Sequence, residues 1–292
     1  MRLFLLPIST RRALVYCQKV TKKPPTELSY IDRATKKAVD TWAGWEQKEK
    51  GWQKMVTKYG NQGLQRIPYE EWGLKSFPPL THSIQADDMA MMEEGKRFDV
   101  VYPANIMNHE DAPLVLSRLA KERKQFHWRR FIGCLIGMPI TVPFALVPVI
   151  PNIPFFYLAF RCWSHWRALR GSDHLDFMLD HRILRFISTP EIENIYKTVA
   201  PDHQHSYQFV MRNQVLDGEE PKELLLLTPR SHVAISRDLQ VPELNLEVER
   251  AVMQVETSLR MQEEEQQQQE KDSMRKEKTA VPASVEPDEK KP

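Results

Sequence analysis

The sequence predicts a mainly α-helical protein with one kinked, proline-rich membrane segment and a disordered C-terminal tail. Three observations carry this prediction. Residues 131–160 contain no charged side chain, apolar residues on either side recur at helical spacing, and residues 262–292 are rich in Gln and charge. The net charge of only +2 gives no basic field of the kind that binds nucleic acid, so we expect no nucleic-acid partner.

Residues 1–25 have the composition of a mitochondrial targeting segment. The first acidic residue is Glu27, and six basic residues precede it: Arg2, Arg11, Arg12, Lys19, Lys22 and Lys23. The inner-membrane potential draws such positive charge toward the matrix. Pro7 and the Arg11–Arg12 pair interrupt the apolar run, which argues against a secretory signal. A strand from Leu3 to Ile8 is the structural alternative, and targeting and a structural role are compatible.

Residues 26–130 are expected to form a soluble helical region. From Ser29 to Tyr59, apolar residues recur three, four and seven positions apart on one stripe, which includes Trp42, Trp45 and Trp52. The stripe could be an aromatic platform for a ligand, a helix at a membrane surface, or a helix packed on a partner helix, and we favour the last. A second helix is expected from about Ala112 to Arg130, with Asn108 as its N-cap.

Residues 131–160 are long enough to cross a bilayer, whose core of about 30 Å needs about 20 helical residues. Five prolines bend or break this segment: Pro139, Pro143, Pro148, Pro151 and Pro154. One kinked crossing is the first expectation. The second expectation is a shallow re-entrant hairpin, because basic residues flank both ends and positive charge is favoured on one side of the membrane. The hairpin would be shallow because residues 153–160 are too few to cross back.

The edges and interior of this segment supply the candidate site residues. Trp, Lys and Arg at the ends of an apolar span contact lipid headgroups, so the expected interfacial anchors are Trp128, Arg129, Arg130, Arg161, Trp163 and Trp166. Gly133 and Gly137 have the GxxxG spacing that lets helices approach closely, and they are the membrane-packing candidates. The segment contains no ionisable residue, which favours an anchor over an ion path.

Residues 161–261 are expected to form a helical C-terminal region. One helix is predicted from Ser172 or Asp173 to Phe186. A second should begin at Pro190, because Thr189 can cap it and Glu191 lies in its first turn. Val248, Val252, Val255 and Leu259 have coiled-coil spacing, which indicates a pairing helix. Residues 262–292 lack apolar anchors, so we expect a disordered tail or a helix that frays beyond about Lys271.

No catalytic, cofactor-binding or metal site is predicted. The three cysteines, Cys17, Cys134 and Cys162, are far apart and form no CxxC pair. His203 and His205 lack a third ligand, and His165, His174 and His181 are scattered. The chain has no HExxH, GxSxG, Walker-type or GxGxxG motif. We therefore expect a protein that is not an enzyme and holds no cofactor.

The order of several unusual strings resembles one family. These strings are RLFLLPISTRR with YCQ, the Trp-rich DRATKKAVDTWAGWEQ, the proline-punctuated apolar segment, and a late helix that begins at PEL. Together, from residue 2 to about residue 256, they resemble the fungal mitochondrial potassium/proton exchange-related family. The resemblance implies a mitochondrial inner-membrane protein that takes part in the exchange of matrix potassium for protons and limits matrix swelling. It also implies that RLFLLPISTRR is retained after import.

Two functions follow as hypotheses. The first is a component or regulator of potassium/proton exchange, working with other inner-membrane proteins in a complex or as a homo-oligomer, because secondary transporters need several spans and a midplane ionisable site. The alternative is a membrane-tethered scaffold or assembly factor with no direct role in transport. In both, the lipid bilayer is a partner.

Overall fold

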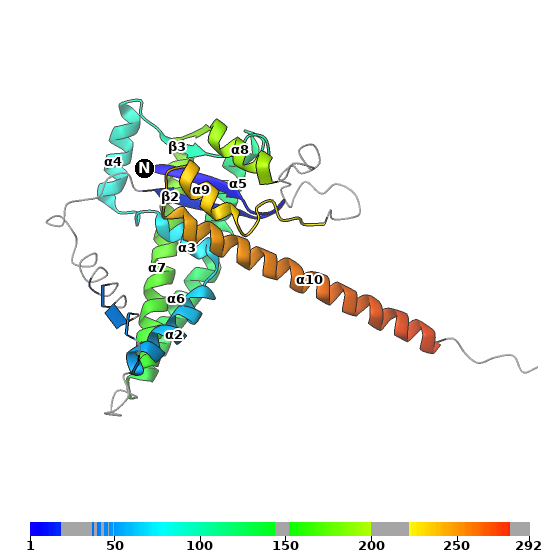
Figure 1. Cartoon of the computed structure of the whole chain (residues 1–292). Coiled ribbons are helices and arrows are strands. Elements are labelled where there is room, and N and C mark those ends of the chain that lie inside the picture. Colours follow the sequence, from blue (N-terminus) through cyan, green and yellow to red (C-terminus); the bar gives the residue numbers. More distant parts are fainter. Residues whose placement is uncertain are drawn as a thin grey trace, which may run out of the picture.

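A computed structural model of the chain describes most of the sequence (Figure 1). The described residues are 1–18, 37, 40–41, 44–45, 47–48, 50–143, 152–199 and 222–280. His203, His205 and about half of the predicted helix from Ser29 to Tyr59 lie outside them. Within that predicted helix, the structure describes the start of α2 (Trp52–Gln65).

A small mixed sheet forms the centre of the fold. Its strands are β1 (Arg2–Pro7), β2 (Ala13–Gln18), β3 (Phe98–Val101) and β4 (Leu184–Ile187), in the order β2-β1-β3-β4. β1 pairs antiparallel with β2 and parallel with β3, and β4 is parallel to β3. The helical fold predicted from sequence therefore holds for most of the chain, and this sheet is an addition to it.

The N-terminal segment is part of this sheet. Leu3, Phe4, Leu5, Leu6 and Ile8 are all fully buried, because β1 lies between two strands and has apolar neighbours on both faces. The strand that the sequence offered as an alternative is thus the observed structure of residues 2–7. Mitochondrial targeting by the same residues stays a prediction.

Helices cover the sheet and extend from it (Figure 1). They are α3 (Tyr69–Ser76), α4 (His82–Glu93), α5 (Asp111–Lys121), α6 (Lys124–Thr141), α7 (Ile153–Asp180), α8 (Pro190–Val199), α9 (Ser231–Asp238) and α10 (Leu244–Ala280). α8 begins at Pro190, as the Thr189–Pro190 sequence predicted.

Two glycines let α3 lie very close to its neighbours. A Cβ added at Gly171 of α7 would lie 2.0 Å from the carbonyl oxygen of Leu74, and one added at Gly73 would lie 2.4 Å from that of Val15. Because these obstacles are backbone atoms, a larger residue would push the elements apart. The backbones of α3, α7 and β2 are therefore in direct contact at these points.

The proline-rich stretch does not form one continuous helix. α6 ends at Thr141 and α7 begins at Ile153, with the Asn152 side chain accepting a hydrogen bond from the Phe155 N–H and donating one to the Thr141 carbonyl. The two helices pack side by side as a hairpin, with Gly137 against Leu158 and His127 against His165. The predicted second form, a hairpin, therefore matches the observed arrangement of these two helices.

The expected single crossing by residues 131–160 is not found in the described part of that segment, residues 131–143 and 152–160. Among the described residues, no helix combines the length and the apolar character that a membrane crossing requires. The physical reason lies in the sequence: α6 starts with basic residues and stops in the proline-rich stretch, and α7 is apolar only up to Phe160, before Arg161.

Two other predicted helices have different bounds. The helix expected over 112–130 is divided between α5 and α6, because the chain turns at Glu122 and Arg123. The helix expected from residue 172 to Phe186 is the end of α7, which stops at Asp180. After a turn with Arg182 at φ 54°, the chain forms β4 in place of a last helical turn.

α10 corrects two expectations about the C-terminal region. Val248, Val252 and Val255 are fully buried in the chain's own core, so this stripe does not await a partner helix. The helix then continues through residues 262–280, so of the two forms expected for this region, a disordered tail or a helix that frays beyond about Lys271, the structure has the helix, and it extends to Ala280. Glu, Gln and Lys are good helix formers, and the Arg260–Glu264 and Gln268–Asp272 contacts span one turn each.

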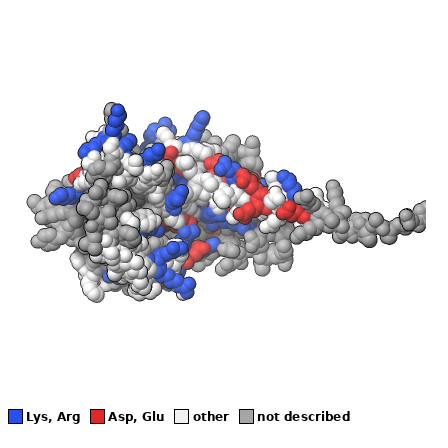
Figure 2. All heavy atoms as spheres, turned by 90° about the horizontal axis from the view of Figure 1, so that it is seen from below, with Lys and Arg blue, Asp and Glu red and all other residues white. Residues whose placement is uncertain are grey.

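The outer part of α10 projects from the body of the protein (Figure 1), and residues 260–274 are exposed. Seen from below, most of the acidic side chains on this face gather to one side, toward that projecting end (Figure 2). Lys and Arg are spread more widely over the same face.

Candidate functional site

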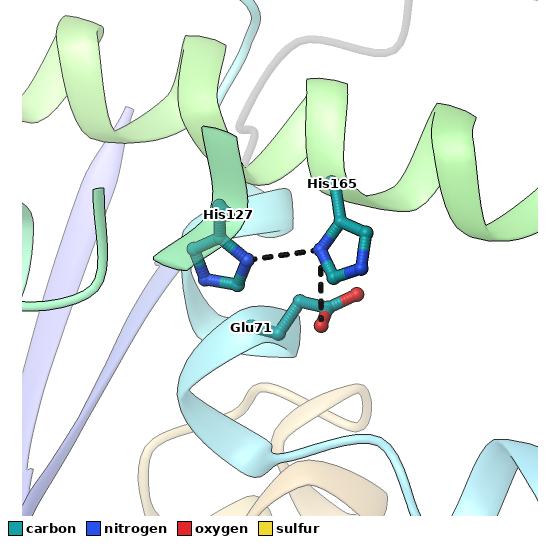
Figure 3. A group of neighbouring side chains, drawn as sticks. All are labelled: Glu71, His127 and His165. Atoms are coloured by element: carbon teal, nitrogen blue, oxygen red, sulfur yellow. Dashed lines mark hydrogen bonds and ion pairs between the residues drawn. The ribbon is translucent and has the colours of Figure 1, made fainter. Parts of the chain in front are cut away.

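Six polar side chains meet inside the protein where α3 crosses the base of the α6–α7 hairpin, and Figure 3 draws three of them, Glu71, His127 and His165. Glu71 and Lys75 come from α3, His127 from α6, and Arg161, Ser164 and His165 from α7. Residues three or four apart on a helix share a face, which is why α3 can present two of them together and α7 three. Glu71, His127 and His165 are exposed by 0, 1 and 2 %, so the cluster is closed to solvent.

Glu71 is the charged centre of the cluster. Arg161 donates two hydrogen bonds to its carboxylate, at 2.9 and 3.2 Å, and the Ser164 hydroxyl donates a third. Lys75 lies 4.0 Å from the same carboxylate and donates to Ser164 at 2.9 Å. Burial by itself raises the pKa of Glu71, but the Ser164 hydrogen bond and the charges of Arg161 and Lys75 outweigh it and hold this pKa below its ordinary value.

The two histidines share a chain of hydrogen bonds whose direction can be worked out. Arg161 can only donate, so Nε2 of His165, at 3.1 Å, is an acceptor. The proton of His165 is then on Nδ1, which donates to Nδ1 of His127 at 3.0 Å. His127 therefore carries its own proton on Nε2. That atom is buried and has no partner among the described residues.

Burial keeps the histidine pair uncharged. The pKa of both His127 and His165 is lowered from 6.5 to about 4, chiefly by desolvation and also by neighbouring arginines, against the opposing pull of Glu71. Desolvation likewise lowers the pKa of Lys75 to about 8. The cluster thus holds one tight ion pair beside a neutral histidine pair.

A metal ion is the other chemistry that Glu71, His127 and His165 suggest, since their ligand atoms all lie within 4.8 Å of one another. The surroundings do not fit it. With a metal on Nδ1 of His165, the ring proton would move to Nε2 and face the N–H of Arg161. Arg161 and Lys75 would also repel a divalent cation in a buried site. The donor set therefore fits a proton-holding network better than a metal centre.

The histidine pair predicts that acid destabilises the fold. Below pH 6.5 the unfolded chain binds protons at these two positions and the folded chain does not, so each histidine lowers the free energy of unfolding by about 1.4 kcal/mol per pH unit down to about pH 4. Urea unfolding of the wild type and of the His127→Gln/His165→Gln variant between pH 7 and 4.5 measures this. The variant should show the shallower pH dependence. Equal slopes would contradict the assignment.

The structure places the predicted interfacial residues in different surroundings. Trp128, Arg129 and Arg130 are exposed on α6, and Trp163 and Trp166 are half-buried on α7. Arg161 is instead turned inward, with its side chain only 14 % exposed, onto Glu71. Of the two packing glycines, Gly137 lies against Leu158, whereas an added Cβ at Gly133 would meet nothing within 4 Å.

Sequence reasoning missed this cluster because its members come from three separate segments. Local patterns place Glu71 only within the soluble helical region 26–130, and His165 among several scattered histidines. The available signal was the four-residue spacing of Glu71 with Lys75 and of Arg161 with His165. Each spacing places two ionisable side chains on the same face of a helix. That pattern indicates paired faces, but which faces meet depends on the tertiary fold.

Comparisons with known proteins agree with the order of motifs in the chain. The family described as mitochondrial K+-H+ exchange-related matches residues 2–179, which include β1, the buried cluster and the α6–α7 hairpin. An uncharacterised protein of Schizosaccharomyces pombe is 28 % identical over 202 residues, covering 68 % of this chain and 83 % of its own length. An uncharacterised protein of Saccharomyces cerevisiae is 24 % identical over 278 residues, covering 87 % and 84 %. No solved structure matches the chain.

Proposed function

Because the chain belongs to the mitochondrial K+-H+ exchange-related family, we propose that it is a mitochondrial inner-membrane component or regulator of potassium/proton exchange. In this role it limits the potassium content and the volume of the matrix, and it works with other inner-membrane proteins or with further copies of itself. It performs no catalysis.

A regulatory role is favoured over that of an ion path, and one observation carries the choice. In the described residues, the apolar parts of the hairpin contain no Asp, Glu, His, Lys or Arg side chain, and such groups gather at its base in a closed cluster. A proton-coupled cation path needs ionisable groups along its length. A closed cluster can respond to protons without conducting them.

The directions of the hydrogen bonds explain how the cluster would respond to protonation. A second proton on His127 would set its Nδ1–H against that of His165, and a second proton on His165 would set its Nε2–H against Arg161. The first event breaks a contact between α6 and α7, and the second breaks a contact within α7. The charges acting on the pair are Glu71 and Lys75 of α3, Arg123 immediately before α6, Arg130 of α6, and Arg161 of α7. Protonation of His127 therefore loosens the contact between α6 and α7 beside Glu71.

Swelling of isolated mitochondria in potassium acetate tests the proposal. Light scattering should report slower swelling in mitochondria that lack the chain, and re-expression of the wild type should restore the rate. Swelling in ammonium acetate, which needs no exchanger, serves as the control and should not change. Unaltered potassium-dependent kinetics without the chain would refute the proposed function.

Point variants test whether the buried cluster regulates exchange or whether exchange only requires that the chain be present. His127→Gln/His165→Gln should change the swelling rate below pH 6.5, where an opened cluster would bind protons at these histidines, and not above it, because their pKa is about 4 in the closed cluster. His181→Gln, at an exposed histidine near the end of α7, should leave the rate unchanged at every pH. An identical pH profile for the double variant would show that the cluster does not regulate exchange.

The projecting part of α10 favours a second candidate, a membrane-tethered scaffold or assembly factor. Met261 and Met274 are exposed by 54 and 62 % on a charged helix that leaves the body of the protein. Removal of residues 262–292 would distinguish the two. Loss of co-purifying proteins with normal potassium-acetate swelling would favour the scaffold.

A further inference from the structure

The end of the α6–α7 hairpin carries an unusual concentration of exposed apolar side chains. They are Leu135, Ile136 and Ile140 on α6, Val142 directly after it, and Phe156 and Tyr157 on α7, each exposed by between 42 and 69 %. The hairpin extends away from the sheet and α2 runs beside it (Figure 1), but these six side chains stay exposed in the presence of α2. Contiguous apolar surface of this kind marks a site of interaction.

The exposed side chains wrap the tip rather than forming one flat face. Gly137 of α6 packs against Leu158 of α7, which fixes the inner sides of the two helices. Ile136 and Ile140 lie on the outer side of α6, and Phe156 and Tyr157 lie on that of α7. A helix that is apolar on several sides is typical of a lipid environment, whereas a protein partner would usually cover one face.

The length of the tip matches one leaflet. At 1.5 Å per residue, residues 131–141 of α6 extend about 16 Å and residues 153–160 of α7 about 12 Å. The hydrocarbon core of a bilayer is about 30 Å thick. Each apolar arm therefore reaches about halfway through it.

Polar and aromatic residues follow where a headgroup layer would begin. Trp128, Arg129 and Arg130 are exposed immediately before the apolar part of α6, and the Trp128 ring stacks on Phe131 with centroids 5.9 Å apart. Beside them is a groove lined by Trp128, Phe131, Trp166 and Leu169, with Lys121, Lys124, Arg170 and Asp173 also lining it. Tryptophan and arginine at the edge of an apolar surface suit the interface of an anionic membrane.

We propose that the α6–α7 tip is a membrane seat, formed by residues 131–143 and 153–160, that enters a single leaflet of an anionic bilayer. Trp128, Arg129 and Arg130 lie at the headgroups, and the buried cluster lies outside the lipid. This deepens the proposed function by naming its lipid partner. Lipid binding needs no exchange activity, so the two proposals can fail separately.

Sedimentation of the full-length chain with lipid vesicles tests the seat. The probes are vesicles of phosphatidylcholine alone and of phosphatidylcholine with phosphatidylserine. The wild type should sediment with both and more with the anionic ones. Ile136→Glu/Ile140→Glu should bind at least about tenfold more weakly, because two charges then replace buried apolar groups. Arg129→Gln/Arg130→Gln should lose only the preference for anionic vesicles.

Leu114→Glu/Val233→Glu is the matched control. These two residues are 53 and 56 % exposed on α5 and α9, away from the tip, so their replacement should leave binding unchanged. Circular dichroism reports whether each variant is folded. If Ile136→Glu/Ile140→Glu is not folded, Phe156→Ser/Tyr157→Ser replaces it.

Three results would overturn the seat. One is equal vesicle binding by the wild type and folded tip variants. Another is a wild type that does not bind vesicles but forms a dimer in ultracentrifugation, together with tip variants that stay monomeric. The tip would then bind a second copy of the chain and not lipid. The third is labelling of an Ile140→Cys variant by an impermeant thiol reagent trapped inside the vesicles, which would indicate a full crossing.

Discussion

Replacement of Leu5 by Asp is expected to unfold the protein. Leu5 is fully buried in β1, where Leu5 pairs with Val15 of β2. A carboxylate at this position has no partner and no water, so the expected loss in free energy of unfolding is about 5 kcal/mol or more. That is comparable with the whole stability of an ordinary domain, which is about 5–15 kcal/mol.

Urea unfolding followed by circular dichroism measures this effect. Val233→Asp, at an exposed apolar position, is the control and should unfold at nearly the wild-type urea concentration. Folded, soluble Leu5→Asp protein with normal stability would show that β1 is not part of the core.

Because β1 is part of the core, we expect that the N-terminal segment is not cleaved during import. Cleavage after residue 18 would delete β1 and β2, two of the four strands. Mass spectrometry of the protein from mitochondria should therefore find residues 2–18 present. A mature chain that begins beyond Gln18 would contradict the sheet described above.

Removal of either partner of the Glu71–Arg161 pair is expected to have the second largest effect. Glu71 is fully buried and the Arg161 side chain is 14 % exposed. Removal of either residue would therefore leave the charge of the other without its partner in a site of low polarity. Breaking such a pair costs about 3–5 kcal/mol. Glu71→Gln and Arg161→Met should each lower the free energy of unfolding by that amount at neutral pH.

A double-mutant cycle separates the pair from its surroundings. Glu71→Gln/Arg161→Met removes both charges together, so its loss should be smaller than the sum of the two single losses by about 2 kcal/mol. The exposed pair Glu94–Lys96, with nitrogen and oxygen 2.7 Å apart, is the matched control, and Glu94→Gln should leave stability unchanged. Additive losses at Glu71 and Arg161 would mean that the two charges do not depend on each other.

The hairpin shows how far local patterns could go. The absence of charged residues from 131–160 indicated a segment that favours lipid, and the prolines indicated a break in the helix. The structure has this break, because α6 ends before it and α7 begins after it. The choice between one crossing and a hairpin was beyond such patterns, because it depends on contacts between the arms. Those contacts are Gly137 with Leu158 and Asn152 with Thr141.

The buried cluster shows the opposite case. Arg161 follows the apolar stretch directly, and the general preference of arginine for membrane interfaces predicted that it would face the headgroups. The structure turns it inward because Glu71, 90 positions earlier, lies on the helix that α7 crosses at Gly171. No local rule connects two residues so far apart.

The sequence by itself determined the mainly helical character, the start of α8 at Pro190, the apolar segment and the family, because each depends on residue type and order over short distances. Only the tertiary structure decided that the basic N-terminal segment is the inner strand β1, that the α10 stripe packs on its own core, and that Glu71, His127 and His165 meet. The physical reason is that burial is a property of the whole fold. A fully buried strand and a closed ion pair are stable only when distant segments exclude water from them.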